Sequence, residues 1–113
     1  MDIAYKTTKM SKIFDSEGKL VKEYGLDRAR KIRMRQDFLR AAVNLAQVPV
    51  SPPTRRHELK GNRKGQFAVD LTGNCRLVFE PNHDPVPRRE DGGIDLQAVT
   101  AITIMSVEDY HND

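Results

Sequence analysis

The most regular alternation of apolar and polar positions in the chain lies in the segment QFAVDLTGNCRLVFE. Every second residue is apolar on both sides of a Thr-Gly-Asn turn: Phe67, Val69 and Leu71 before it, and Cys75, Leu77 and Phe79 after it. A three-residue loop with Gly73 or Asn74 at positive φ keeps both sets on one face of a hairpin. The pattern predicts a β-hairpin that leaves Asp70 and Arg76 together on the opposite, open face.

Apolar residues at helical spacing predict two helices before this hairpin. The first extends from Lys9 to Tyr24 and stops at Gly25. The second lies within residues 26–48, with Asp27 as its N-cap and the segment PVSPP ending it. Its apolar stripe contains Ile32, Leu39, Val43 and Ala46, beside Phe38 and Leu45. Its other face carries Arg28, Arg30, Lys31, Arg33, Arg35 and Arg40. That basic face fits a nucleic acid backbone, an ordinary solvated helix or an acidic partner segment, and the sequence leaves these three open.

The two ends of the chain predict strands. The segment DIAYKT alternates weakly, and TAITIMSVEDYH is rich in β-branched residues. Between the hairpin and the last strand, residues 81–98 hold three prolines, two adjacent glycines and the acidic run REDGGID, which predicts a long mobile loop. We therefore expect one α+β domain over residues 1–113, with two helices on one side of a mainly antiparallel sheet.

Composition changes this picture mainly through charge. Residues 1–79 hold 17 Lys/Arg against 8 Asp/Glu, whereas residues 80–113 hold 2 against 8. This asymmetry indicates a basic face for a polyanion. The single cysteine excludes an intramolecular disulfide and fits a reducing compartment. With no apolar signal core and no run of membrane-spanning length, we expect a cytoplasmic protein without membrane contact.

Two histidines are candidates for acid–base chemistry. His57 follows two arginines in RRHELKGNRKG, and these cations disfavour its protonated form and leave a proton acceptor. His111 lies among acidic residues in VEDYHND. In an extended strand its side chain would point to the same side as Asp109, whose carboxylate favours the imidazolium, a proton donor. Two groups in opposing environments are typical of an acid–base pair. The alternative for each histidine is an ordinary surface or core-edge position, which is the commoner place for a single histidine.

Four cations around His57 and in the hairpin fit phosphate binding: Lys60, Arg63, Lys64 and Arg76. Cleavage of RNA through its own 2′-hydroxyl needs a base, an acid and cations around the charged phosphorus, and it needs no metal. A solvated charge cluster is the alternative, with Asp70 as a second candidate partner for Arg76. The histidines and acids show no metal-ligand spacing, so we expect no metal and no cofactor. We expect Cys75 to be a buried hydrophobe.

The combination of HELKGNRKG, the hairpin with its GNCR turn and the terminal EDYH resembles the HigB branch of the RelE/ParE toxin superfamily, the plasmid-maintenance killer proteins. The resemblance implies a fold of the microbial ribonuclease type. It also implies a type II toxin that cleaves mRNA on the ribosome, without a metal, leaving a cyclic phosphate and a 5′-hydroxyl and so inhibiting translation. Its implied partners are a HigA-like helix-turn-helix antitoxin, the ribosome and mRNA, and we expect a heterotetramer with the antitoxin.

The resemblance also implies which residues act. The family's site positions correspond to His57, Lys60, Arg76, Asp109, Tyr110 and His111. Among these, His111 is the expected acid and His57 the base or a phosphate ligand. Lys60 and Arg76 would stabilise the transition state, and Tyr110 would stack on or orient a base. Further RNA or phosphate contacts are expected from Arg55, Arg56, Arg63 and Lys64.

Two other functions fit the same chain. A ParE-like inhibitor of DNA gyrase would keep the fold and have no need of a terminal histidine. A basic RNA-binding module without catalysis would bind with steep salt dependence and cut nothing.

Overall fold

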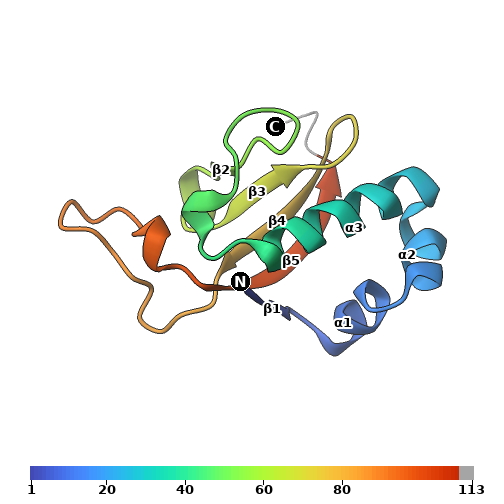
Figure 1. The fold of residues 1–113 in the computed structure, drawn as a ribbon, viewed down its shortest axis with the longest axis horizontal. Helices are drawn as coiled ribbons and strands as arrows, with labels where there is room; N and C mark the ends of the chain where they lie inside the picture. The colour runs from blue at the N-terminus through green and yellow to red at the C-terminus, as the bar shows by residue number, and fades with distance from the viewer. Residues whose placement is uncertain (110–113) are drawn as a thin grey trace.

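The computed structural model describes residues 1–109; residues 110–113 lie outside the described part. A five-stranded sheet forms one layer and the helices cover one of its faces (Figure 1). The strands are β1 (Asp2–Tyr5), β2 (His57–Glu58), β3 (Phe67–Asp70), β4 (Cys75–Pro81) and β5 (Ala101–Asp109). Their order is β1-β5-β4-β3-β2, with β1 parallel to β5 and the other neighbours antiparallel. The α+β prediction is confirmed, but β2 lies in a segment that the sequence predicted as loop.

The first predicted helix is two helices, α1 (Thr8–Phe14) and α2 (Glu17–Tyr24). The chain breaks at Ser16, whose hydroxyl accepts a hydrogen bond from the Lys19 backbone N–H and caps α2. The prediction of one helix from Lys9 to Tyr24 is therefore wrong, because a serine cap interrupts an apolar spacing that continues across it.

The second predicted helix, α3 (Leu26–Ala41), is shorter than expected. Its N-cap is Gly25 at φ 83°, not Asp27, and Ala42 leaves the helix in extended conformation. Val43 is 66% exposed and Ala46 is exposed too, so neither belongs to the apolar stripe. Instead, a short 3₁₀ turn, η1 (Leu45–Gln47), follows α3 and buries Leu45. Helical spacing in the sequence thus continued past the true end of the helix.

The hairpin prediction is confirmed. All six alternating apolar residues are buried in the main core, which the helices close from one side: Phe67, Val69, Leu71, Cys75, Leu77 and Phe79. Gly73 has a φ of 52°, as one of the two expected positions in the turn. Ile32 and Leu39 of α3 join the same core, so α3 packs on this face of the sheet.

A β-bulge in β5 decides which side chains reach the other face of the sheet. Val78 pairs with Ser106 but Phe79 pairs with Ile104, so Met105 is the extra residue. Ile104 faces the helices, and after the bulge Val107 also packs against that core. Ser106 and Glu108 consequently lie on the face away from the helices. If Met105 were an ordinary residue of a regular strand, strict alternation from Ile104 would have placed both of them on the helix side.

Residues 81–98 leave the sheet at the Pro81 end of β4, opposite to the end at Cys75 (Figure 1). An isolated bridge joins Arg88 to Ile94, Ile94 is buried in the core, and a 3₁₀ turn, η3 (Leu96–Ala98), returns the chain to β5. The segment holds little regular secondary structure, and its expected mobility stays a prediction. Within residues 1–109, no helix is both long and apolar enough to cross a membrane.

Candidate functional site

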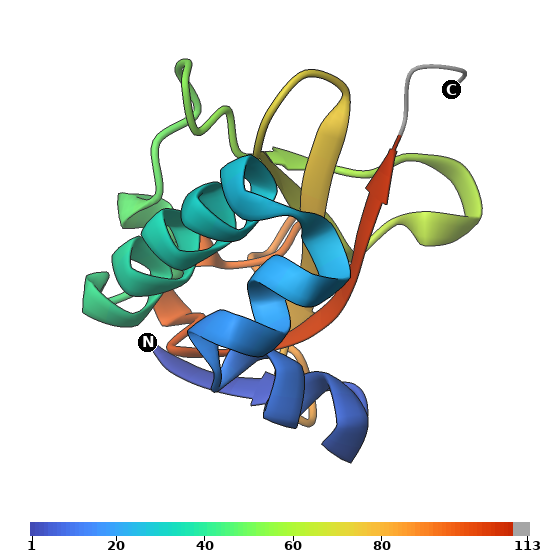
Figure 2. The same cartoon turned by 90° about the vertical axis from the view of Figure 1, so that its right-hand side faces the viewer.

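The sheet face opposite the helices, called the open face below, carries the candidate site. In Figure 2 the helices lie on one side of the sheet and the yellow-green loop near residue 60 extends on the other. A small apolar cluster of Leu59, Ala68 and Val78 lies here, with Met105 against it. Beside it is a cavity of about 420 Å³, lined by Leu59, Lys60, Arg63 and Arg76 and called the basic cavity below.

Strand pairing arranges the open face in two rows. One row runs His57, Ala68, Val78 and Ser106 across four strands. The adjacent row runs Asp70, Arg76 and Glu108. The rows place a histidine beside alternating charges, and two strand spacings, about 10 Å, separate β2 from β4. The expectation that Asp70 and Arg76 share this face is confirmed by their pairing. The face is not open at Arg76, which is only 7% exposed.

Glu108 lies at the β5 end of the charged row, and the sequence did not predict its role. Its carboxylate accepts hydrogen bonds from Arg63 Nη1 and Nη2 at 2.7 and 3.0 Å, and from Arg76 Nε and Nη2 at 3.2 and 2.9 Å. The Ser106 hydroxyl donates a further bond of 2.7 Å. We call Arg63, Arg76, Ser106 and Glu108 the Glu108 cluster.

The Glu108 cluster keeps its carboxylate ionised. Hydrogen bonding from Arg63 is the largest influence, and together with bonds from Ser106 and Arg76 it outweighs partial burial and lowers the pKa of Glu108 to about 2. Bonds between ionised groups at these distances are the strong class of protein hydrogen bonds. Arg63 and Arg76, both expected as phosphate ligands, therefore meet at one carboxylate beside the basic cavity.

His57 lies on the open face because it pairs with Ala68. Its Nδ1 is 2.9 Å from the backbone oxygen of Arg55. A carbonyl oxygen only accepts, so Nδ1 carries the proton, and in the neutral ring Nε2 holds the lone pair. That tautomer presents a proton acceptor, which is the chemistry expected of His57.

The two arginines before His57 have different partners. Arg55, at φ 49°, donates from Nε and Nη2 to the Asp70 carboxylate at 2.7 and 3.1 Å. Arg56 donates to the backbone oxygen of Val48 and is half-buried, which lowers its pKa. Arg55 thus belongs to the charged face, whereas Arg56 connects β2 to the segment after α3 and is poorly placed for the RNA contact expected of it.

The remaining cations of this segment are exposed. Lys60 lines the basic cavity, and Lys64 follows the 3₁₀ turn η2 (Gly61–Arg63) that carries Arg63. Glu58 accepts a hydrogen bond from the Gly65 backbone N–H, which closes this loop. The loop therefore presents Lys60 and Arg63 from one side of the cavity, while β4 presents Arg76 from beneath.

The terminal cluster is only partly described. Asp109 pairs with Cys75, whose side chain is buried under the helices, and its carboxylate lies 3.4 Å from Arg28 Nη2 at the start of α3. It thus points away from Glu108 and the open face. Tyr110 and His111 lie outside the described residues, so the acid–base pairing of His111 with His57 stays a prediction.

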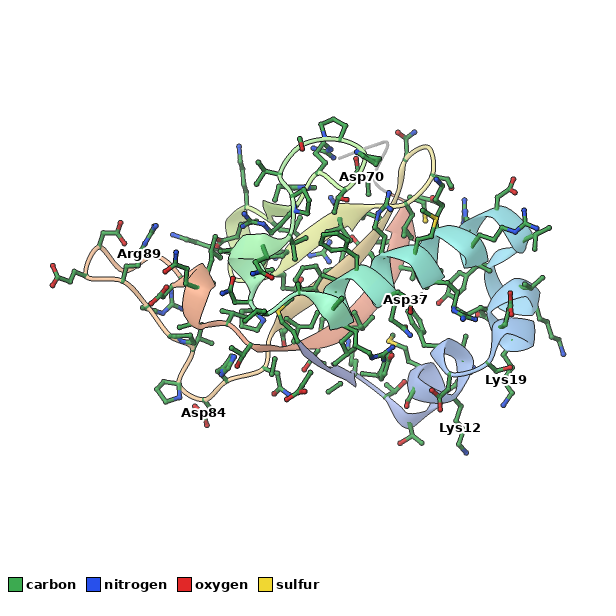
Figure 3. The ribbon with its side chains drawn as sticks, viewed as in Figure 1. Lys12, Lys19, Asp37, Asp70, Asp84 and Arg89 are labelled. Atoms are coloured by element: carbon green, nitrogen blue, oxygen red, sulfur yellow. The ribbon has the colours of Figure 1, made fainter. Side chains whose placement is uncertain are left out.

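The basic face predicted for α3 is not continuous. Arg35 is buried and its Nε donates to the Asp70 backbone oxygen at 2.8 Å, so it connects α3 to β3. Arg28 pairs with Asp109, and Arg33 lies 3.7 Å from Glu17. The charged side chains labelled in Figure 3 lie on different sides of the molecule, with Asp70 near the loop that precedes β2. Of the three roles left open for this helix face, a long nucleic acid track is the least supported.

Residues 1–109 offer no candidate site for metal or thiol chemistry. Among residues 1–109, no group of three or more His, Cys, Asp and Glu side chains is arranged to hold a metal ion. Cys75 is buried, as predicted, and burial raises its pKa. His83 Nε2 accepts hydrogen bonds from the backbone N–H groups of Thr100 and Ala101, which gives it a structural role at the base of the 81–98 segment.

No protein-family model and no curated protein matches the sequence. Two solved structures share its fold. A YoeB/ParE toxin from Agrobacterium tumefaciens superposes with a TM-score of 0.55 at 13% identity, covering 98% of this chain and 100% of that one. The YoeB dimer from Staphylococcus aureus gives 0.52 at 16% identity, covering 98% and 97%. The chain therefore has the fold of YoeB/ParE toxins over nearly its whole length.

Proposed function

We propose that the chain is the toxin of a type II toxin–antitoxin system and cleaves messenger RNA on the ribosome. The observation that carries the proposal is the basic cavity on the open face, where Arg63, Arg76 and Lys60 converge on the face that carries His57. The fold supports it independently, because its structural neighbours are a YoeB/ParE toxin and a YoeB dimer. The HigB branch remains the branch that the sequence motifs favour.

The reaction follows from what each group can donate or accept. His57 Nε2 accepts the proton of the ribose 2′-hydroxyl as its oxygen attacks the phosphorus. The bond from phosphorus to the 5′-oxygen breaks, and His111 donates a proton to that oxygen. The products are a 2′,3′-cyclic phosphate and a 5′-hydroxyl. Arg76 and Lys60 stabilise the charge on the phosphorus, so no metal ion is required.

The other site residues would hold the substrate. Tyr110 would stack on a base of the message. Arg63 would bind the scissile phosphate and Arg55 and Lys64 flanking ones, whereas Arg56 would act through the position of β2. Asp109 would orient the end of the chain through Arg28.

The proposal implies partners and a compartment. A toxin of this kind acts in the cytoplasm on the ribosome and message and is neutralised by a HigA-like helix-turn-helix antitoxin, in a complex we expect to be a heterotetramer. The exposed face of α3, which carries Met34 and Phe38 among arginines, is a surface that an acidic segment of such a partner would fit.

The test is primer extension on a message in programmed ribosomes. We expect discrete cuts within codons for the wild-type chain, and a loss of about 10²–10⁴-fold in rate for His57→Ala and for His111→Ala. A His83→Ala variant is the matched control, since His83 binds backbone at the far end of the sheet. Uncut message with all samples, or full activity in both site variants, would overturn the proposal. Free RNA is not a substitute substrate, because the ribosome is expected to orient the 2′-hydroxyl.

A second candidate is a ParE-like inhibitor of DNA gyrase, favoured by the fold that the chain shares with the Agrobacterium YoeB/ParE toxin. It predicts inhibition of DNA supercoiling by purified gyrase and uncut message. A non-catalytic RNA-binding module predicts neither effect and gives salt-sensitive binding alone. The primer-extension and supercoiling assays together separate all three.

A further inference from the structure

Two guanidinium groups share one carboxylate beside the basic cavity. Arg63 binds both oxygens of Glu108, and Arg76 binds Oε1 with two of its nitrogens. The arginines come from different elements, η2 and β4, so no local backbone geometry holds them together. Without an anion between them, two such cations repel each other, and the long side chain of Arg63 samples many rotamers.

We propose that Glu108 is the positioning residue that holds Arg63 and Arg76 side by side, so that they bind a single phosphate together. This inference rests on the proposed function for its substrate, the scissile phosphate of RNA. A guanidinium has more N–H donors than one carboxylate can accept, so both arginines can hold Glu108 and still donate to a phosphate.

The backbone is built to place this carboxylate. The bulge at Met105 turns Ser106 and Glu108 to the open face, and strand pairing sets Glu108 directly opposite Arg76. The Ser106 hydroxyl then fixes Oε2 at 2.7 Å. Arg76 is 7% exposed, so its guanidinium needs a permanent anionic partner in the absence of substrate.

Proton transfer is a poor alternative role for Glu108. A carboxylate whose pKa is lowered to about 2 is a weak base and remains ionised wherever RNA is cleaved. A second alternative is that Glu108 occupies the place of the phosphate and competes with it. Positioning and competition predict opposite results when the charge is removed, so a substitution separates them.

The experiment compares Glu108→Gln, Glu108→Asp and a matched control, Glu80→Gln. Glu80 lies on β4, and within the described residues its carboxylate accepts from Gln66 rather than from an arginine. The probe is inorganic phosphate alone, titrated while the side-chain N–H signals of Arg63 and Arg76 are followed by NMR. Thermal unfolding of each variant is recorded alongside.

In the wild-type chain and Glu80→Gln we expect slowly exchanging arginine signals, and both arginines should respond together to phosphate. Glu108→Gln should lose the slow exchange and bind phosphate about tenfold more weakly, the cost of a charged hydrogen bond. Glu108→Asp keeps the charge on a shorter side chain, so it should stay folded and give an intermediate affinity. This variant keeps the test valid if Glu108→Gln unfolds.

Tighter phosphate binding by Glu108→Gln would overturn positioning in favour of competition. An absence of phosphate response from Arg63 and Arg76 in the wild-type chain would overturn the shared phosphate site itself, and so would equal weakening in Glu80→Gln. On ribosomes, Glu108→Gln should lower kcat by on the order of tenfold to a hundredfold, less than removal of a direct donor. If phosphate binding changes as expected but the wild-type chain cuts no message on ribosomes, the proposed function is wrong and the positioning role of Glu108 still holds.

Discussion

Glu108 and Asp109 are consecutive carboxylates in one strand, yet their surroundings differ sharply. Glu108 binds two arginines and a serine on the open face, and its pKa falls to about 2. Asp109 lies on the helix side, 3.4 Å from Arg28, and both partners of that pair are nearly half exposed, at 49% and 43%. The two side chains have the same charge but project from opposite sides of β5. The contacts of an acidic residue in this strand therefore depend on which face of the sheet its side chain reaches.

The largest difference should appear when the cation of each pair is removed. Arg76→Ala removes one partner of the partly buried Glu108 carboxylate and takes a cation from the basic cavity. We expect cleavage to fall by about 10²–10³-fold and unfolding free energy by about 2 kcal/mol. Primer extension and urea unfolding measure the two effects. Normal activity in a folded Arg76→Ala chain would contradict the site.

The next largest difference between the two carboxylates should appear when the pH is lowered. The pKa of Glu108 in the folded chain, about 2, lies below its ordinary value of 4.5. Its contribution to stability is therefore complete above that ordinary value and is lost as the pH falls through the folded pKa. The stability gap between the wild-type chain and Glu108→Gln, from urea unfolding at several pH values, should narrow across this window. A gap that is constant with pH would contradict the ionised cluster.

A smaller effect is expected from the serine of the Glu108 cluster. Ser106→Ala removes one hydrogen bond to Oε2 and leaves both arginines in place. We expect a loss of about 1 kcal/mol in unfolding free energy and a small upward shift in the pKa of Glu108. The unfolding midpoint in urea and the carboxyl ¹³C shift of Glu108 measure these changes.

The smallest effect should come from the exposed pair. Arg28→Ala breaks the contact with Asp109 and should change unfolding free energy by less than about 1 kcal/mol. The difference should diminish further in high salt, where exposed charges are screened. A loss as large as that of Arg76→Ala would show that exposure does not distinguish the two pairs.

The sequence predicted the parts of the molecule that local pattern controls. Alternation in the hairpin placed its six apolar residues in the core and put Arg76 beside Asp70, because a regular strand has a fixed period of two. The sequence also identified the basic segment RRHELKGNRKG, part of which lines the basic cavity. The role of His57 as a proton acceptor stays a prediction; its contact with the Arg55 carbonyl is a feature of the fold that the sequence did not show.

What the sequence did not predict depends on contacts between distant segments. Glu108 was missed because the bulge at Met105 shifts the alternation; the change from Ile102 and Ile104 to Val107 was the available signal. Arg35 was assigned to the basic outer face of the helix because its partner, the Asp70 backbone, lies in a strand far along the chain. The strand β2 was missed because two residues are too few to show an alternation of apolar and polar positions.

The order of the strands has a consequence for synthesis. β5 lies between β1 and β4, so β1 has no neighbour in the sheet until residues 101–109 have left the ribosome that makes them. Glu108 arrives with that same strand, and the two arginines that it holds were translated long before it. The Glu108 cluster is consequently completed only after the helices and the other four strands have been made, and none of those elements contains the assembled cluster by itself.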